Sequence, residues 1–171
     1  GIGGNTISLS KKFKKVHSIE LDQTRFMYLC NNLNLCDCKN VICYNANYLN
    51  VCWALEQDAV LIDPPWGGAS VYWDKKPRIY LSNVPIEYVV QRLLQKIPVV
   101  ASKVPTNFDI VGLRELLTNY RVHHYKLRKM HLIVCSHNPQ QKKKEEEVKL
   151  PYTEILTKKS QLDDKTTKDT Q

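Results

Sequence analysis

Short apolar runs alternate along the chain with stripes of apolar residues spaced for one face of a helix. The runs predict strands at residues 16–20, 40–44, 59–62, 98–101, 120–127 and 130–136. The stripes predict helices that end near residue 13, follow Asp22, span 49–55, begin at 83 and span 109–119. This alternation is typical of an α/β fold with a mostly parallel sheet, and the last two strands are expected to close it as an antiparallel hairpin.

The segment that follows the apolar run 59–62 carries the most informative chemistry. Residues 63–68 read Asp-Pro-Pro-Trp-Gly-Gly, and open α/β sheets bind ligands beyond the carboxyl ends of their strands. The prolines lack N–H groups, so their carbonyls can face a ligand, and the glycines let a ligand approach the backbone. Asp63 can accept a hydrogen bond from an amino group, and Trp66 offers a flat face for a base. The segment therefore predicts a site for an exocyclic amine on a planar ring.

A glycine-rich turn opens the chain. Residues 1–6 read Gly-Ile-Gly-Gly-Asn-Thr, and a turn of this kind normally joins a strand to a helix. Because the chain begins at the turn, we expect it to be a fragment that lacks the first, central strand of its sheet. Asn5 or Thr6 is expected to cap the helix that follows. A plain tight turn with no ligand is the alternative.

Two further strand ends carry residues suited to a nucleoside. Glu20 ends the run 16–20, where an acid accepts hydrogen bonds from ribose hydroxyls in nucleoside-binding α/β folds. Asp22 is expected to cap the next helix. The run 40–44 is followed by Asn45-Ala46-Asn47-Tyr48, and an amide at this position can bond an adenine amino group. A polar loop with no such role is the alternative.

Residues 69–82 interleave aromatic and cationic side chains. The segment contains Tyr72, Trp73, Lys75, Lys76 and Arg78. Such a mixture suits RNA binding through stacking and phosphate contacts, and it also suits a loop packed over its own domain.

The composition predicts a basic protein, and the sequence contains no predicted membrane-spanning segment. The net charge of +8 fits either a polyanionic partner such as nucleic acid or a solvated, lysine-rich surface. The sequence has no apolar run of about 18 residues and no secretory signal, which predicts a soluble intracellular protein. Residues 1–140 are expected to form one domain, and the charged residues 141–171 a disordered tail.

The cysteines do not follow a zinc-binding pattern. Cys36 and Cys38 are separated by one residue, and no second Cys/His pair completes a site. We expect six reduced thiols, mostly buried, and no metal, with a structural metal site as the alternative.

The segment 64–68 resembles the motif of RNA cap guanine-N2 methyltransferases, the trimethylguanosine synthase family. The similarity extends from Gly1 to about Cys135 and implies a Rossmann-like class I methyltransferase fold. It implies a monomer that binds S-adenosylmethionine and capped RNA, in the nucleus or the cytoplasm. The implied cofactor-binding residues are Gly1, Gly3, Asn5, Thr6, Glu20, Asn47 and Asp63. The implied catalytic residues are Asp63, Pro64 and Trp66, and the implied substrate-binding residues are Trp66, Gly67 and Asn107.

The resemblance also implies a mechanism. Trp66 would stack on the 7-methylguanine of the cap, while Asp63 or the Pro64 carbonyl orients the exocyclic amine for methyl transfer. The family often carries serine at position 63, and aspartate there is common in amino-methyltransferases that act on adenine or cytosine. The alternatives are therefore an enzyme that acts on adenine in nucleic acid and a non-catalytic, RNA-binding Rossmann-like domain.

Overall fold

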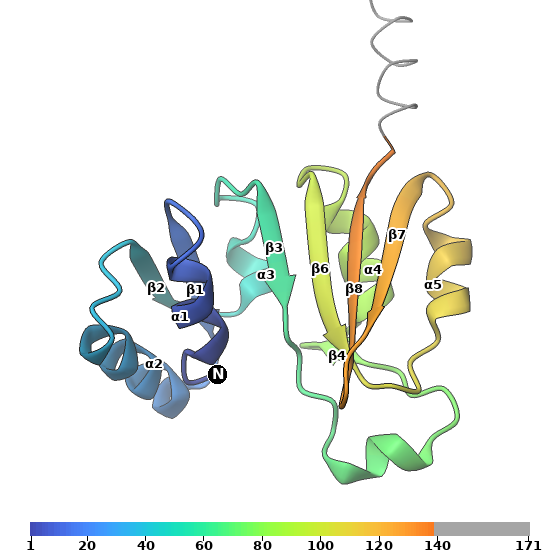
Figure 1. Cartoon of the computed structure of the whole chain (residues 1–171), viewed down its shortest axis with the longest axis horizontal. Coiled ribbons are helices and arrows are strands. Elements are labelled where there is room, and N and C mark those ends of the chain that lie inside the picture. The colour runs from blue at the N-terminus through green and yellow to red at the C-terminus, as the bar shows by residue number, and fades with distance from the viewer. Residues whose placement is uncertain (139–171) are drawn as a thin grey trace, which may run out of the picture. The chain divides into compact units, whose positions relative to one another are not determined.

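In the computed structural model, residues 1–138 are described, and the chain divides into two units (Figure 1). The first unit is Gly1–Glu56, and the second begins at Gln57. The tail predicted at 141–171 lies outside the described residues.

The first unit is a parallel strand pair with three helices. Its elements are α1 (Gly4–Ser10), β1 (Val16–Glu20), α2 (Gln23–Leu35), β2 (Val41–Asn45) and α3 (Tyr48–Val51). β1 and β2 pair in parallel from Val16 opposite Val41 to Glu20 opposite Asn45. Because the strands run in the same direction, their carboxyl ends meet at one edge.

Local signals fix α2 as the sequence predicts. The Asp22 carboxylate accepts a hydrogen bond from the Arg25 N–H at 2.8 Å, which caps the first turn. Leu29 and Leu33 are buried one turn apart on the same face. The cap is therefore confirmed, and of the apolar stripe Phe26, Leu29, Cys30 and Leu33 the two leucines are buried.

The start of α1 corrects the expectation that Asn5 or Thr6 caps this helix. Gly3 is the N-cap residue, at φ 108°, and no side-chain hydrogen bond caps this end of the helix. A Cβ atom on Gly3 would lie 3.2 Å from Leu29 Cδ1, so both the backbone angle and the close packing favour glycine. The helix thus begins before Asn5, and the buried Thr6 hydroxyl bonds to Ser18 Oγ at 2.8 Å.

The second unit contains a mixed four-stranded sheet. Its elements are β3 (Ala59–Ile62), the 3₁₀ helix η1 (Ala69–Trp73), β4 (Tyr80–Leu81), β5 (Val84–Pro85), α4 (Ile86–Leu93), β6 (Val99–Val104), α5 (Ile110–Leu116), β7 (Tyr120–Lys126) and β8 (His131–His137). The strand order is β3-β6-β8-β7, with β3 and β6 parallel and the other neighbours antiparallel. The α/β class and the closing antiparallel hairpin are confirmed.

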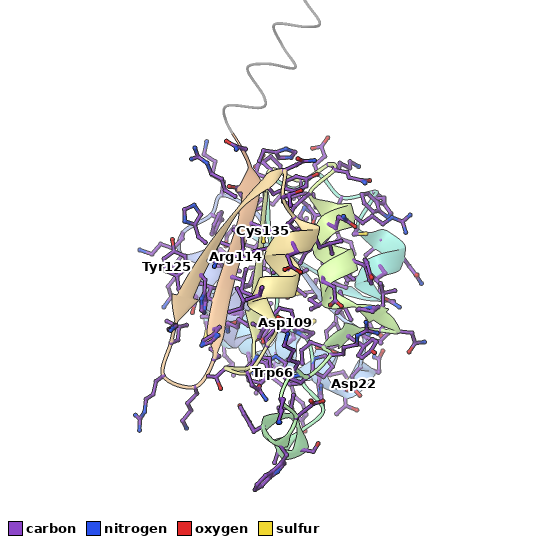
Figure 2. The ribbon with its side chains drawn as sticks, turned by 90° about the vertical axis from the view of Figure 1, so that its right-hand side faces the viewer. Asp22, Trp66, Asp109, Arg114, Tyr125 and Cys135 are labelled. Atoms are coloured by element: carbon purple, nitrogen blue, oxygen red, sulfur yellow. The ribbon has the colours of Figure 1, made fainter. Side chains whose placement is uncertain are left out.

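The core of the second unit lies between the sheet and two helices. Along β6 the buried residues alternate as Val100, Ser102 and Val104. Both α4 and α5 lie on one side of the sheet (Figure 2). They bury Ile86, Val89, Val90, Leu93 and Leu113. Full burial of each such side chain contributes roughly 1.5–3 kcal/mol.

The pairing partners of β1 and β3 are relevant to the predicted additional central strand. Within residues 1–138, β1 pairs with β2 alone and β3 with β6 alone. A further central strand stays a prediction.

The cysteines differ in part from expectation. All six are free thiols, but only Cys52 and Cys135 are buried, so the expectation of mostly buried thiols is wrong. The other four lie in the first unit, where Cys30, Cys38 and Cys43 are partly accessible and Cys36 is exposed. No helix within residues 1–138 combines the length and apolar character needed to cross a membrane.

Candidate active site

The first candidate cluster lies at the carboxyl ends of β1 and β2. The amino group of Gly1 forms an ion pair with Glu20 Oε2, and Glu20 Oε1 accepts a hydrogen bond from the Asp22 N–H at 2.8 Å. The Glu20 side chain is 11% exposed. The glycine turn and the predicted ribose-binding acid are therefore brought together.

The turn that leads to Asn47 is tied to the same strand end. The Asn45 side chain and the Ala46 N–H both donate to the Glu20 carbonyl, at 2.9 and 3.1 Å. The Asn47 Oδ1 atom accepts a hydrogen bond from the Leu49 N–H at 3.0 Å and caps α3. The polar loop therefore has a structural role, and a contact from Asn47 to adenine stays a prediction.

The donor and acceptor groups of this cluster fit a nucleoside cofactor. Cβ atoms built on Gly1 and Gly4 would meet nothing within 4 Å, so the turn is open to a bound molecule. Beside it, the Glu20 carboxylate supplies the acceptor that a ribose diol requires. Within the described part of the chain, no group of three or more His, Cys, Asp or Glu side chains is placed to hold a metal ion.

The second candidate site is an open pocket in the second unit. It has a volume of about 360 Å³ and is lined by Asp63, Pro64, Trp66, Gly68 and Tyr72. Gly67 and Gly68 have φ angles of +87° and +85°, which explains why this turn requires glycine. The sequence motif thus folds into a concave surface that carries an acid and an indole.

Lys103 contacts both of those groups. Ile62, the last residue of β3, lies opposite Ser102 of β6. The residues that follow them, Asp63 and Lys103, therefore lie side by side. Lys103 Nζ lies 3.3 Å from Asp63 Oδ2, and the Trp66 indole N–H donates to the Lys103 carbonyl at 3.3 Å. Sequence reasoning missed Lys103 because it ended the strand at residue 101; the alternation through residue 104 was the available signal.

Asn107 lies under the loop that borders the pocket. Its Nδ2 donates to the carbonyls of Val71 and Asp74, at 2.8 and 2.6 Å, and so holds both ends of the turn that carries Tyr72. Its Oδ1 is buried and has no protein partner. The observed role is support of the loop, and the predicted substrate contact has not been tested. Tyr72, which lines the pocket, was not among the predicted site residues.

Residues 1–151 match the family described as RNA cap guanine-N2 methyltransferase. The chain belongs to this family. The resemblance seen in the sequence is therefore confirmed. Protein L320 of Acanthamoeba polyphaga mimivirus, which is uncharacterised, is 37% identical over 139 residues. The match covers 78% of this chain and 54% of L320, so the chain spans about half the length of this curated relative.

Solved structures of methyltransferases share the fold of this family member. SMU.1697c of Streptococcus mutans, solved with SAH, aligns with a TM-score of 0.59 at 16% identity, over 81% of this chain and 84% of that one. The precorrin-6y C5,15-methyltransferase of Geobacter metallireducens aligns with a TM-score of 0.61 at 14% identity, over 81% of this chain and 76% of that one. An rRNA methylase of Streptococcus thermophilus aligns with a TM-score of 0.56 at 12% identity, over 80% of this chain and 81% of that one. The Rossmann-like class I methyltransferase fold is confirmed, and at these identities the likeness shows the fold alone.

Proposed function

We propose that this chain transfers a methyl group from S-adenosylmethionine to the exocyclic N2 amine of 7-methylguanosine at an RNA 5′ cap. The product would be 2,7-dimethyl- or 2,2,7-trimethylguanosine. The observation that carries the proposal is the pocket in which Asp63 and Trp66 face the same space, within a chain of the cap guanine-N2 methyltransferase family.

The cofactor is assigned to the glycine turn and the strand ends of the first unit. When bound, S-adenosylmethionine supplies an activated methyl group on a sulfonium. Glu20 accepts hydrogen bonds from the ribose hydroxyls, and its bond from the Asp22 N–H fixes the carboxylate for that task. Gly1, Gly3 and Asn5 form the turn around the methionine part of the cofactor.

The cap base is assigned to the pocket of the second unit. A 7-methylated guanine carries a positive charge, so it stacks strongly on indole by the cation–π effect. The hydrogen bond from Trp66 to the Lys103 carbonyl fixes the plane of the ring before the base arrives. Preorganisation of this kind lowers the entropic cost of binding.

Asp63 orients the acceptor amine. The lone pair of an amine on a purine is delocalised into the ring, so the amine is a poor nucleophile. A hydrogen bond from the amine to the Asp63 carboxylate, or to the Pro64 carbonyl, positions it and favours donation of the lone pair. Its proton leaves to Asp63 or to water. Most of the rate enhancement then comes from positioning.

A panel of acceptors tests the proposal directly. The chain, together with any residues that precede Gly1 in its natural sequence, is incubated with labelled S-adenosylmethionine and one acceptor. The acceptors are 7-methylguanosine cap analogue, unmethylated cap analogue and an adenine-containing oligonucleotide. We expect label in the 7-methylated cap alone. Label in the oligonucleotide would reassign the enzyme to adenine. If the cofactor binds but no acceptor is labelled, none of the three acceptors is the substrate. If the cofactor does not bind, the result would indicate a non-catalytic domain.

Trp66 variants test the stacking role within the same assay. Trp66→Ala removes the stacking face and is expected to raise KM for the 7-methylated cap roughly 10- to 100-fold. Trp66→Phe keeps an aromatic face and loses the bond to the Lys103 carbonyl, so its KM should fall between those of the wild type and the alanine variant. Unchanged KM in Trp66→Ala would exclude stacking.

A further inference from the structure

The 3₁₀ helix η1 presents two aromatic side chains to solvent. Trp73 is 87% exposed and Tyr72 is 52% exposed. Large aromatic side chains are usually buried or in contact with a partner, because their apolar surface is costly to hydrate. The neighbouring Val71 and Ile79 are buried, so the chain reaches the core on both sides of the exposed pair.

The exposure is not that of a loosely held loop. Asn107 donates to the carbonyls of Val71 and Asp74, on either side of the aromatic pair. The Asp74 carboxylate accepts from the Lys76 N–H at 3.1 Å, and Lys76 Nζ lies 2.8 Å from Asp109 Oδ2. These bonds hold the backbone of the turn, so its aromatic side chains project from a fixed support.

The exposed aromatic pair is continuous with the pocket. Tyr72 lines the same space as Asp63 and Trp66, and Trp73 is the next residue along the chain. Figure 1 shows this segment, in green, projecting beyond the carboxyl ends of β3 and β6. A ligand that fills the pocket and extends outward past Tyr72 would therefore meet Trp73.

The charge beside the aromatic pair is positive. Lys75 and Arg78 are exposed, and the segment 69–82 holds three cations and one acid. Aromatic faces with adjacent cations match a single-stranded nucleic acid, whose bases stack and whose phosphates are anionic. An apolar protein partner would not require the cations.

We propose that Tyr72 and Trp73 stack against the first nucleotides of the RNA that follow the cap, while Lys75 and Arg78 neutralise their phosphates. This inference rests on the proposed function, since it extends the substrate from the cap to the RNA body. It assigns to η1 the ability to distinguish a capped RNA from a free cap nucleotide.

Binding of uncapped RNA tests the surface without any catalytic step. The full chain is titrated against a labelled, uncapped oligonucleotide of about eight nucleotides, and anisotropy gives Kd. Trp73→Ala should weaken binding about 10-fold. The matched control is Tyr125→Ala, which removes an aromatic side chain of 52% exposure from β7, away from α5 (Figure 2), and should leave Kd unchanged. Equal Kd values for Trp73→Ala and the wild type would overturn the proposal.

Salt dependence tests the cations separately. Each single-strand phosphate contact contributes about 0.7 to the slope of log K against log salt, so Lys75→Ala/Arg78→Ala should make the slope shallower by about 1.4. An unchanged slope would overturn the assignment of these two residues.

Kinetics then separate this inference from the proposed function. Trp73→Ala should raise KM for a 7-methylated capped oligonucleotide about 10-fold and leave KM for the cap analogue unchanged. An equal rise for both substrates would place Trp73 in cap binding and overturn the proposal. If the wild type methylates neither substrate, the proposed function fails, and the anisotropy result still decides whether η1 binds RNA.

Discussion

The two candidate sites both lie at the carboxyl ends of parallel strands, yet they use their polar groups differently. In the first unit, Glu20 accepts a hydrogen bond from the Asp22 N–H, Asn47 caps α3, and the Thr6 hydroxyl is buried against Ser18. In the second unit, the Asp63 side chain is 41% exposed and lines an open pocket. The first site is therefore formed largely by backbone shape and a constrained carboxylate, whereas the second presents side chains that can meet a substrate.

This difference predicts different consequences of mutation. Side chains of the pocket should affect transfer, and those of the first unit should affect cofactor affinity without changing the chemistry. The predictions below test this division, from the largest expected effect to the smallest.

Asp63→Ala should lower kcat for methyl transfer about 100- to 10,000-fold, because the acceptor amine loses its hydrogen-bond acceptor. Cofactor affinity, measured by calorimetry, should remain close to that of the wild type. Asp58→Ala is the matched control, since Asp58 is an exposed acid just before the opposite end of β3. Full activity in Asp63→Ala would remove this acid from the mechanism. A large loss of cofactor affinity would contradict the assignment of cofactor binding to the first unit and methyl transfer to the pocket.

Glu20→Gln should raise the Kd of S-adenosylmethionine about 10-fold, because a neutral amide is a weaker acceptor for ribose hydroxyls than a carboxylate. Glutamine keeps an oxygen for the bond from the Asp22 N–H, so the end of β1 should remain folded. Calorimetry measures the affinity, and Glu56→Gln, an exposed acid of the same unit, serves as the control. If kcat falls at saturating cofactor while Kd is unchanged, Glu20 is not a cofactor-binding residue.

Lys103→Met should lower kcat on the order of 3-fold, with little change in KM for the cap. The Lys103 and Asp63 side chains are 22% and 41% exposed, so water screens the pair and its contribution is modest. Methionine keeps the apolar stem and removes the charge, whereas Lys103→Arg restores the charge and should restore most of the rate. In the Asp63→Asn background, Lys103→Met should have no further effect, because the two residues act as one pair. Additive losses would show that Lys103 acts elsewhere.

Thiol reactivity compares a partly buried cysteine of the first unit with a buried cysteine of the second. Burial raises the pKa of Cys135 in β8 to about 12. Partial burial, and then the neighbouring Cys30 thiol, raises the pKa of Cys43 in β2 to about 11. One pKa unit changes the thiolate fraction tenfold, so Cys43 should be alkylated about 10-fold faster than Cys135 at pH 8.

Mass spectrometry after timed exposure to iodoacetamide measures these rates. The exposed Cys36 should react before both, and unfolding in urea should bring all the rates together. Equal rates for Cys43 and Cys135 in the folded protein would show that the two thiols are equally protected.

Most of the fold could be predicted because it depends on local patterns. The strands at 16–20 and 59–62 have the expected bounds, and Asp22 caps α2, since apolar period and capping chemistry act within a few residues. The pocket could be predicted for the same reason, because its acid, indole and glycines are consecutive in sequence.

The contacts that were missed are long-range or depend on exact geometry. Lys103 reaches Asp63 through the register of β3 and β6, which no local pattern specifies. The capping error at Asn5 and Thr6 arose because Gly3 adopts a positive φ and starts the helix earlier. The bonds from Asn107 to the carbonyls of Val71 and Asp74 could not be predicted either, because the loop that carries those carbonyls has an irregular path.

The double contact of Lys103 also makes this position useful for altering the proposed activity. Asp63 is bonded to the lysine side chain, but Trp66 is bonded to the main-chain carbonyl, which every amino acid carries. A substitution at position 103 can thus change the charge beside Asp63 while the Trp66 indole keeps its hydrogen bond to the main-chain carbonyl. Saturation mutagenesis of this one codon would vary the surroundings of Asp63 beside a fixed indole, which makes it a practical starting point for testing other acceptors under the proposed function.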